Sequence, residues 1–246
     1  MTPISDRSDH DHHPEAIRER LAEEPEASYL RDWVYGGIDG SVTTFAIVSG
    51  VVGAGLSPAV ILILGVANLV ADGFSMAAGN YSATRTEKQE LETLRSVEER
   101  HIAQYPEGER EEVRQIYEKQ GFRGEDLERM VEAMTANRNR WIDFMIAEEY
   151  GVARHIRSAK KAAAATFTAF LVCGVVPLLP FLLRMPNPFG ASLVMTLAVF
   201  FGIGSVKSRV LTVSWWRAGL ETLVIGAIAA AIAYVIGLLL GGIGRT

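Results

Sequence analysis

Residues 59–83 read AVILILGVANLVADGFSMAAGNYSA, an apolar run in which Asp72 is the single charged side chain. A second run, Trp33 to Leu56, holds Asp39 within Gly36-Gly37-Ile38-Asp39-Gly40. Each run can cross a hydrocarbon layer about 30 Å thick as a helix. An ionised side chain at that depth costs about 2.5–3.5 kcal/mol on insertion scales, so such residues usually face a bundle interior or an aqueous path. The two runs predict membrane helices with functional carboxylates, and cation transport is our first hypothesis.

Three further apolar runs, at 162–184, 189–206 and 212–243, raise the number of expected spans to five. The 246 residues are 49% hydrophobic and 22% charged, which is typical of a membrane protein with a charged extramembrane insert. We therefore expect an all-α membrane protein with five transmembrane helices and a cytoplasmic three-helix insert between helices 2 and 3. The expected parts are a disordered polar tail (1–28), helices 1 and 2 (29–84), the insert (85–160) and helices 3 to 5 (161–246).

The distribution of Lys and Arg predicts the orientation. Basic residues cluster at both membrane ends of the insert, and Lys207 and Arg209 lie between the fourth and fifth runs, whereas the turn 53–58 has no charge. The positive-inside rule places the N-terminus, the insert and the 207–211 turn in the cytoplasm and the C-terminus outside. The first 30 residues contain no apolar segment of the kind found in signal sequences. We expect the inner membrane of a bacterium as the location, but the sequence does not itself distinguish a bacterial from a vacuolar membrane.

Helical patterns divide the insert. Its first helix continues the second span past Tyr81 as far as the Pro106 turn, and a short helix, Glu109 to Gln120, ends at Gly121. A third helix is expected to begin near Gly124 and to run towards Lys161. Pro177 and Pro180 are expected to kink or loosen the third span.

Potential metal ligands recur along the second span. Asn68, Asp72 and Met76 follow one another at four-residue intervals, which keeps them on one stripe of a helix. Oxygen ligands combined with a thioether favour a softer divalent ion such as Fe²⁺ over Mg²⁺ or Ca²⁺. In the first span Asp39 and Thr43 share a face. A buried carboxylate there could bind a cation or a proton in turn, because burial favours the protonated form and a bound cation favours the ionised form.

The insert supplies a second set of candidate ligands, in pairs three or four residues apart on helices. These pairs are Glu98 with His101, Glu109 with Glu112, and Met145 with Glu149. The alternative is a solvated, salt-bridged surface, since Glu-rich helices interleaved with Arg usually form one. A di-iron oxidase would need two Glu-x-x-His motifs, and Glu98-Glu99-Arg100-His101 is the only match, so we do not expect an enzyme.

Several features of the sequence bear on other partners, disulfides and further metal sites. The net charge of −5 and the lack of a basic stripe argue against a nucleic-acid partner. The single cysteine, Cys173, excludes an intrachain disulfide and is expected to be a buried thiol. The tail segment His10-Asp11-His12-His13 could bind a transition metal or could be a solvated tail. No prosthetic group is expected.

The chain resembles the vacuolar iron transporter family, which comprises plant vacuolar and yeast iron transporters with bacterial relatives. The resemblance extends from about Tyr29 to the C-terminus. The matching segments are Arg31-Asp32-Trp33, Gly36 to Gly40, Ala71 to Gly79, Trp141 to Met145 and Gly174 to Phe181, together with the five-span plan. It implies a bacterial-type member, a homodimer of five-helix protomers with a cytoplasmic metal-binding domain. The resemblance also implies exchange of Fe²⁺, and often Mn²⁺, for protons, with metal leaving the cytosol.

The family's path residues correspond to Asp39 and Met76, and its cytoplasmic ligands to Glu98, Glu109, Glu112, Glu149 and Met145. Three positions depart from the plant-type pattern. Asn68 replaces a glutamate, while Asp72 adds a carboxylate where those members have glycine. His101 replaces a glutamate of the cytoplasmic set, and Ile146 replaces its second methionine. These changes are expected to affect ion selectivity more than transport itself.

Two other functions remain as alternatives. The chain could be a membrane-anchored metal-binding or sensing protein whose helical insert is the active part, in which case Asp39 and Asp72 would be dispensable. Export of a small organic cation would require an aromatic cage, and few aromatic residues lie near Asp39 and Asp72 in the sequence. The sequence does not rank Fe²⁺, Mn²⁺, Co²⁺ and Zn²⁺.

Overall fold

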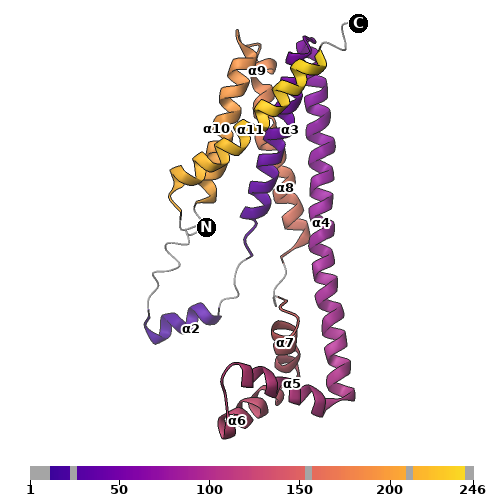
Figure 1. Cartoon of the computed structure of the whole chain (residues 1–246), viewed down its shortest axis with the longest axis vertical. Helices are drawn as coiled ribbons and strands as arrows, with labels where there is room; N and C mark the ends of the chain where they lie inside the picture. The colour runs from indigo at the N-terminus through magenta and orange to yellow at the C-terminus, as the bar shows by residue number, and fades with distance from the viewer. Residues whose placement is uncertain (1–11, 23–26, 153–156, 209–212, 242–246) are drawn as a thin grey trace. The chain divides into compact units, whose positions relative to one another are not determined.

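The computed structural model describes residues 12–22, 27–152, 157–208 and 213–241, and all regular structure in these ranges is helical (Figure 1). The helices are α2 (Pro14–Ala22), α3 (Leu30–Gly53), α4 (Pro58–Gln104), α5 (Pro106–Lys119), α6 (Gly124–Thr135), α7 (Arg138–Glu148), α8 (Ala159–Gly174), a 3₁₀ turn η1 (Val176–Leu178), α9 (Leu179–Leu182), α10 (Pro188–Lys207) and α11 (Trp215–Gly241). The all-α prediction therefore holds for the described residues. Two compact units are present, one made of Met1–Tyr81 with Ala159–Thr246 and the other of Ser82–Ser158.

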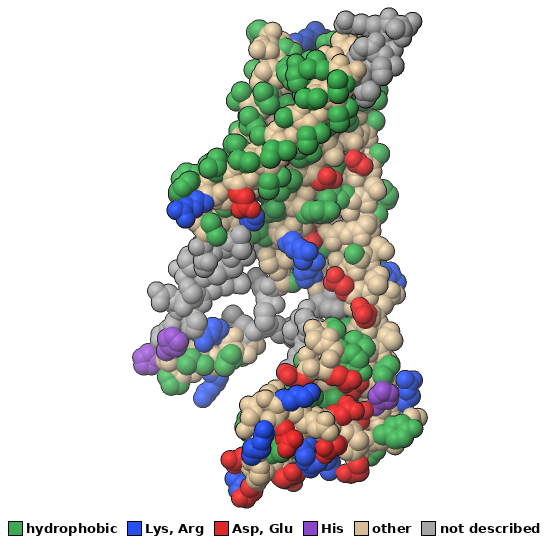
Figure 2. Space-filling view, in the orientation of Figure 1, with side chains coloured by type: hydrophobic (Ala, Val, Ile, Leu, Met, Phe, Trp, Pro, Cys, Tyr) green, Lys and Arg blue, Asp and Glu red, His purple; other side chains and the backbone are tan. Residues whose placement is uncertain are grey.

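Within the described residues, five helical segments are long and apolar enough to cross a membrane, and each overlaps one predicted span. They are Leu30–Gly53, Pro58–Gln104, Ala159–Leu182, Pro188–Lys207 and Trp215–Leu239. Hydrophobic side chains dominate the visible surface of the first unit, whereas acidic and basic side chains dominate that of the second (Figure 2). The chain is a multi-pass membrane protein.

The third span is interrupted where the prolines predicted an interruption. Helix α8 ends at Gly174, Pro177 lies in the 3₁₀ turn η1, and Pro180 lies in the single turn of α9. Proline lacks a backbone N–H donor and its ring crowds the preceding turn, so a straight helix cannot continue through both positions. Ser192 donates a hydrogen bond of 2.8 Å to the Pro177 carbonyl, which satisfies one of the backbone groups exposed by the break.

Helix α3 packs directly against the backbone of α8. A Cβ atom at Gly36 would overlap the Thr166 carbonyl, and one at Gly40 would overlap the Phe170 carbonyl. The second contact lies four residues after the first on both helices, so α3 and α8 run parallel. Small residues at such positions let membrane helices approach closely, and dispersion contacts then hold them together. The same helix also packs against α10 and α11, which makes α3 the centre of the bundle.

Helices α4 and α8 pack against each other and run antiparallel. Its buried positions recur every fourth residue, at Ile61, Gly65, Leu69, Gly73 and Ala77. Gly65 faces Leu178, Leu69 faces Gly174, and Gly73 faces Phe170. Each pair of residue numbers has the same sum, as expected for antiparallel helices in a constant register. The other sides of α4 are largely exposed on the protomer.

The second unit differs from the sequence prediction in one helix. Helix α5 begins at Pro106, a favoured first-turn residue, and ends before Gly121, whose φ of 104° only glycine adopts easily. The expected third helix is instead two helices, α6 and α7, separated at Ala136 and Asn137. Asn137 is extended, with φ −119° and ψ 114°, and its side chain accepts a hydrogen bond from the Arg140 N–H. This N-cap starts a new helix, so the prediction of one helix running towards Lys161 was wrong.

Helix α2 lies within segment 1–28, which we expected to be a disordered polar tail, so that prediction does not hold for Pro14–Ala22. The expectation of a disordered tail falls largely on residues 1–11 and 23–26, which lie outside the described residues. His10 and Asp11 of the candidate tail metal site also lie outside them.

The close α3–α8 contact leads to a first prediction. Gly36→Ala and Gly40→Ala should each destabilise the bundle by about 1–3 kcal/mol, because overpacking forces the two backbones apart. Thermal unfolding of the detergent-solubilised protein would measure the change. Gly202→Ala is the control, since Gly202 is exposed on α10 and a Cβ atom there meets nothing within 4 Å. Equal midpoints for Gly36→Ala and Gly202→Ala would contradict the prediction.

Candidate functional site

The carboxylates of Asp39 and Asp72 lie near each other in the membrane unit. Asp39 is partly buried on α3, Asp72 is exposed on α4, and the two are within electrostatic range. Among the residues that the structure describes, no Lys or Arg forms an ion pair with either carboxylate. Two like charges without a basic partner repel each other, so the pair gains stability when it binds protons or a cation.

Hydrogen bonds between α3 and α4 flank the carboxylate pair on both sides. Asn68 donates to the Thr43 hydroxyl over 3.2 Å, and that hydroxyl donates to the Asp39 backbone carbonyl over 2.9 Å. Asn80 donates to a carboxylate oxygen of Asp32 over 3.0 Å. The sequence prediction included Asn68 but missed Asp32 and Asn80. The sequence spacing could have indicated Asn80, since this residue continues the four-residue series of Asn68, Asp72 and Met76.

Met76 occupies a different environment from Asp72. Its side chain is partly buried and packs against the apolar cluster that contains Leu69 and Phe170. The thioether thus lies at the edge of the core, one helical turn from Asp72. A flexible, polarisable side chain in such a place can pack and also reach a passing soft cation.

In the second unit, two glutamates from different helices are buried together. Glu98 of α4 is fully buried and Glu109 of α5 is 5% exposed, and their carboxyl groups are hydrogen-bonded. His101 Nδ1 lies 3.4 Å from Glu109 Oε1. Glu112 and Glu149 are exposed but close enough to act on Glu109 electrostatically. The structure therefore brings together five of the six residues predicted in the insert.

The buried glutamates each retain an acceptor without a partner. Glu98 Oε2 and Glu109 Oε2 are buried and accept no hydrogen bond from any described residue. A buried carboxylate oxygen without a donor is costly, and a bound cation would remove that cost. In the described part of the chain no three His, Cys, Asp or Glu side chains already have the spacing of a metal site. The cluster is thus a set of available ligands rather than a closed coordination shell.

Burial and mutual repulsion change the proton affinity of this cluster. Burial, followed by the charges of Glu112, Glu98 and Glu149, raises the pKa of Glu109 to about 7. Burial and the charges of Glu98 and Glu112 also raise the pKa of Glu149. A carboxyl that titrates near neutral pH exchanges a proton for a cation without a large pH change.

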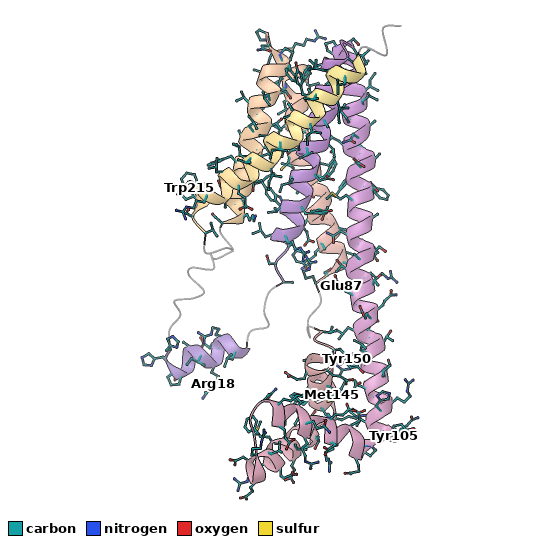
Figure 3. The ribbon with its side chains drawn as sticks, viewed as in Figure 1. Arg18, Glu87, Tyr105, Met145, Tyr150 and Trp215 are labelled. Atoms are coloured by element: carbon teal, nitrogen blue, oxygen red, sulfur yellow. The ribbon has the colours of Figure 1, made fainter. Side chains whose placement is uncertain are left out.

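Met145 and Tyr150 have roles that the spacing did not show (Figure 3). Met145 is fully buried in the apolar core of the second unit, with Trp141, Ile142 and Ile146. Tyr150 was not among the predicted site residues, but it donates a hydrogen bond of 3.1 Å to Glu98 Oε1. Only the fold brings these two residues, 52 positions apart in the chain, together.

A family model described as the VIT family matches residues 30–238, which cover the five spans and the insert. The chain belongs to the VIT family. Among its relatives, vacuolar iron transporter 1 of Arabidopsis thaliana is 33% identical over 211 residues, which are 83% of this chain and 83% of the relative. The vacuolar iron transporter of Toxoplasma gondii is 31% identical, over 87% of this chain and 75% of the relative. That of Plasmodium berghei is 30% identical, over 86% and 82%. The resemblance inferred from the motifs is confirmed, and this VIT family protein belongs with transporters, not enzymes.

The raised pKa of Glu109 leads to a second prediction. The folded protein binds more protons than the unfolded chain between about pH 4.5 and pH 7, so this group's contribution to stability is present below that window and is lost as pH rises through it. Glu109→Gln should therefore stabilise the metal-free protein at about pH 8 and change it little at about pH 5. Thermal unfolding in a chelator at both pH values would test this.

The matched control is Glu107→Gln, which changes an exposed glutamate of the same helix. It should leave the pH dependence of wild type intact. An unchanged pH dependence in Glu109→Gln would show that the cluster does not hold a proton near neutral pH.

Proposed function

We propose that this protein exports divalent metal from the cytosol in exchange for protons, with Fe²⁺ as the main ion and Mn²⁺ as a second substrate. The observation that carries the proposal is that Asp39 and Asp72, on two membrane spans, lie within electrostatic range of each other, with no basic partner among the residues that the structure describes. Its relatives are vacuolar iron transporters. Charges that cost free energy in hydrocarbon are retained where they bind an ion or a proton.

The exchange follows from the electrostatics of the pair. With both carboxylates ionised, their repulsion and the low dielectric favour either one dication or protons between them. A dication that arrives displaces the protons, and protons that arrive from the other side displace the dication. Asn68 and Met76 on the same stripe would supply an oxygen and a sulfur ligand to the ion.

The acidic cluster of the second unit would collect the ion from the cytosol. The buried oxygens of Glu98 and Glu109 lack donors, and His101, Glu112 and Glu149 lie around them. Met145 would join as a sulfur ligand only if the surrounding core opens, because its side chain is fully buried. Release of a proton from Glu109 near neutral pH would accompany loading.

The proposed orientation has the N-terminus and the second unit in the cytoplasm and the C-terminus outside, in the inner membrane of a bacterium. Lys207 at the end of α10 and Arg217 near the start of α11 place positive charge on the expected cytoplasmic side. Glu221 partly offsets this charge, since it lies 3.7 Å from Lys207.

We also propose a homodimer formed across the open face of α3 and α4. Asp72 is exposed on the protomer, where it would face lipid unless another chain covers it. Ala46, Gly50 and Ala54 continue the face of Asp39 and line an apolar groove of about 540 Å³ with residues of α11. A second copy packed against this face would enclose the carboxylates of both protomers.

A third prediction tests transport. Purified protein in liposomes should take up Fe²⁺ when a pH gradient is imposed, and Asp39→Asn should lower the initial rate by about tenfold or more, as loss of an ion ligand does. Asp72→Asn should have a similar effect. Glu221→Gln, on an exposed carboxylate of α11 outside the site, is the control and should transport like wild type. Full uptake by Asp39→Asn would refute the role assigned to the pair.

The same variants distinguish transport from the alternative function, a membrane-anchored metal-binding or sensing protein. It predicts no uptake driven by a pH gradient, and metal binding that depends on Glu98 and Glu109 but not on Asp39. The buried unpartnered oxygens of the two glutamates are the observation in its favour.

A fourth prediction concerns ion choice. Asn68→Glu adds a third carboxylate to the stripe of Asp72 and Met76, which should increase uptake of the harder ion Mn²⁺ relative to Fe²⁺. Competition between the two ions in the liposome assay would measure the ratio. Asn68→Gln, which keeps the amide, is the control for side-chain length, and an equal ratio in both variants would contradict the prediction.

A further inference from the structure

Polar contacts between α3 and α4 form three pairs in one antiparallel register. Asp32 and Thr43 are hydrogen-bonded to Asn80 and Asn68, and between them Asp39 lies within electrostatic range of Asp72. The two residue numbers of each pair add up to nearly the same value, as they must where two straight helices run antiparallel with equal rise per residue. The outer two pairs are hydrogen-bonded, whereas the middle pair consists of two carboxylates that repel each other.

The outer pairs must therefore hold the helices in the register that the middle pair opposes. On α3 the three residues fall within about 40° of one another around the helix axis, and on α4 the series from Asn68 to Asn80 covers about 120°. A shift of α4 by one residue would rotate Asp72 by about 100° away from Asp39. Repulsion between the carboxylates favours such a shift whenever no cation lies between them.

Of the two asparagines of α4, Asn80 forms more hydrogen bonds with neighbouring helices than Asn68 does. Its amide donates to Asp32 Oδ1 at 3.0 Å on α3, and to Thr166 Oγ1 at 2.7 Å and the Ala162 carbonyl at 3.4 Å on α8. The Thr166 hydroxyl donates to the same Ala162 carbonyl over 3.1 Å, which leaves its oxygen free to accept from Asn80. One side chain of α4 thus binds two other helices.

The side chains that accept hydrogen bonds from Asn80 are buried and held in place. Asp32 is 5% exposed and Thr166 is fully buried. Asp32 lies in the first turn of α3, where the helix dipole favours a negative charge. Because α3 and α8 are already in backbone contact at Gly36 and Thr166, Asn80 meets a rigid pair of helices.

We propose that Asn80 is a positioning residue for transport, which sets the register of α4 on α3 and α8 and so holds Asp72 opposite Asp39. Its importance for transport rests on the proposed function of that carboxylate pair, whereas the register itself does not. Hydrogen bonds between helices in a membrane are modest individually, so loss of the three Asn80 contacts should weaken the register without unfolding the bundle.

The register can be read without measuring transport. Thr43→Cys and Asn68→Cys place two thiols where the native side chains are 3.2 Å apart, about 18 Å along α4 from Asn80. Cys173→Ala removes the single native thiol. In this background Asn80→Ala and Asn80→Asp should each lower the rate of disulfide formation between residues 43 and 68 by about three- to tenfold. Ser82→Ala, at an exposed position of α4, should leave the rate unchanged.

A reciprocal exchange distinguishes positioning from loss of a fold. Asn80→Asp places two carboxylates opposite each other, and Asp32→Asn removes the acceptor charge, so either change alone should lower both the disulfide rate and Fe²⁺ uptake. The double variant Asp32→Asn/Asn80→Asp restores an amide–carboxylate hydrogen bond with donor and acceptor exchanged, and it should recover most of both. Uptake is measured in the chain with native Thr43 and Asn68.

The outcomes separate the two proposals. Disulfide rates in Asn80→Ala and Asn80→Asp equal to that of the parent would overturn the positioning role, whatever the uptake. The role would also be overturned if the double variant recovered neither the disulfide rate nor uptake. Lower disulfide rates with reciprocal recovery, in a protein that takes up no Fe²⁺, would uphold the register and refute the proposed function.

Discussion

A carboxylate at membrane depth needs a hydrogen-bond donor, a proton or a cation, and this requirement divides Asp32, Asp39 and Asp72 into two kinds. Asp32 receives the amide of Asn80 and lies in the first turn of a helix. Asp39 and Asp72 lie within electrostatic range of each other without a basic partner among the described residues. The first kind of carboxylate holds helices together, and the second is available for an ion.

The arrangement of α3 makes this division possible. Gly36 and Gly40 bring one face of the helix into backbone contact with α8, so that face needs no side chains to fill it. A neighbouring face of the same helix, about 60° around its axis, carries Asp39 and Thr43 towards α4. Close packing along one face therefore gives a rigid support for the polar residues of the face beside it, and rigidity matters because a repelling pair would otherwise separate.

The buried carboxylates of the second unit also need a donor, a proton or a cation, and there two glutamates are buried together. Glu98 and Glu109 are buried and hydrogen-bonded to each other, and burial raises the pKa of Glu109 to about 7. Their outer partners, Glu112 and Glu149, are exposed. Under the proposed function such a cluster would bind cations in competition with protons, while the apolar core around Met145 holds α4, α5, α6 and α7 together.

The sequence by itself determined the five spans, the break at Pro177 and Pro180, the end of α5 before Gly121, and the stripe of Asn68, Asp72 and Met76, because periodicity, proline and glycine act locally. It did not separate α6 from α7, since the Asn137 cap lies in a segment without glycine or proline. Only the tertiary structure paired Asn80 with Asp32 and Thr166, buried Glu98 against Glu109, and placed Met145 in a core. A helical pattern fixes which side of a helix a residue occupies, but its partner comes from a helix far along the chain, as with Asn80 and Thr166, 86 residues apart.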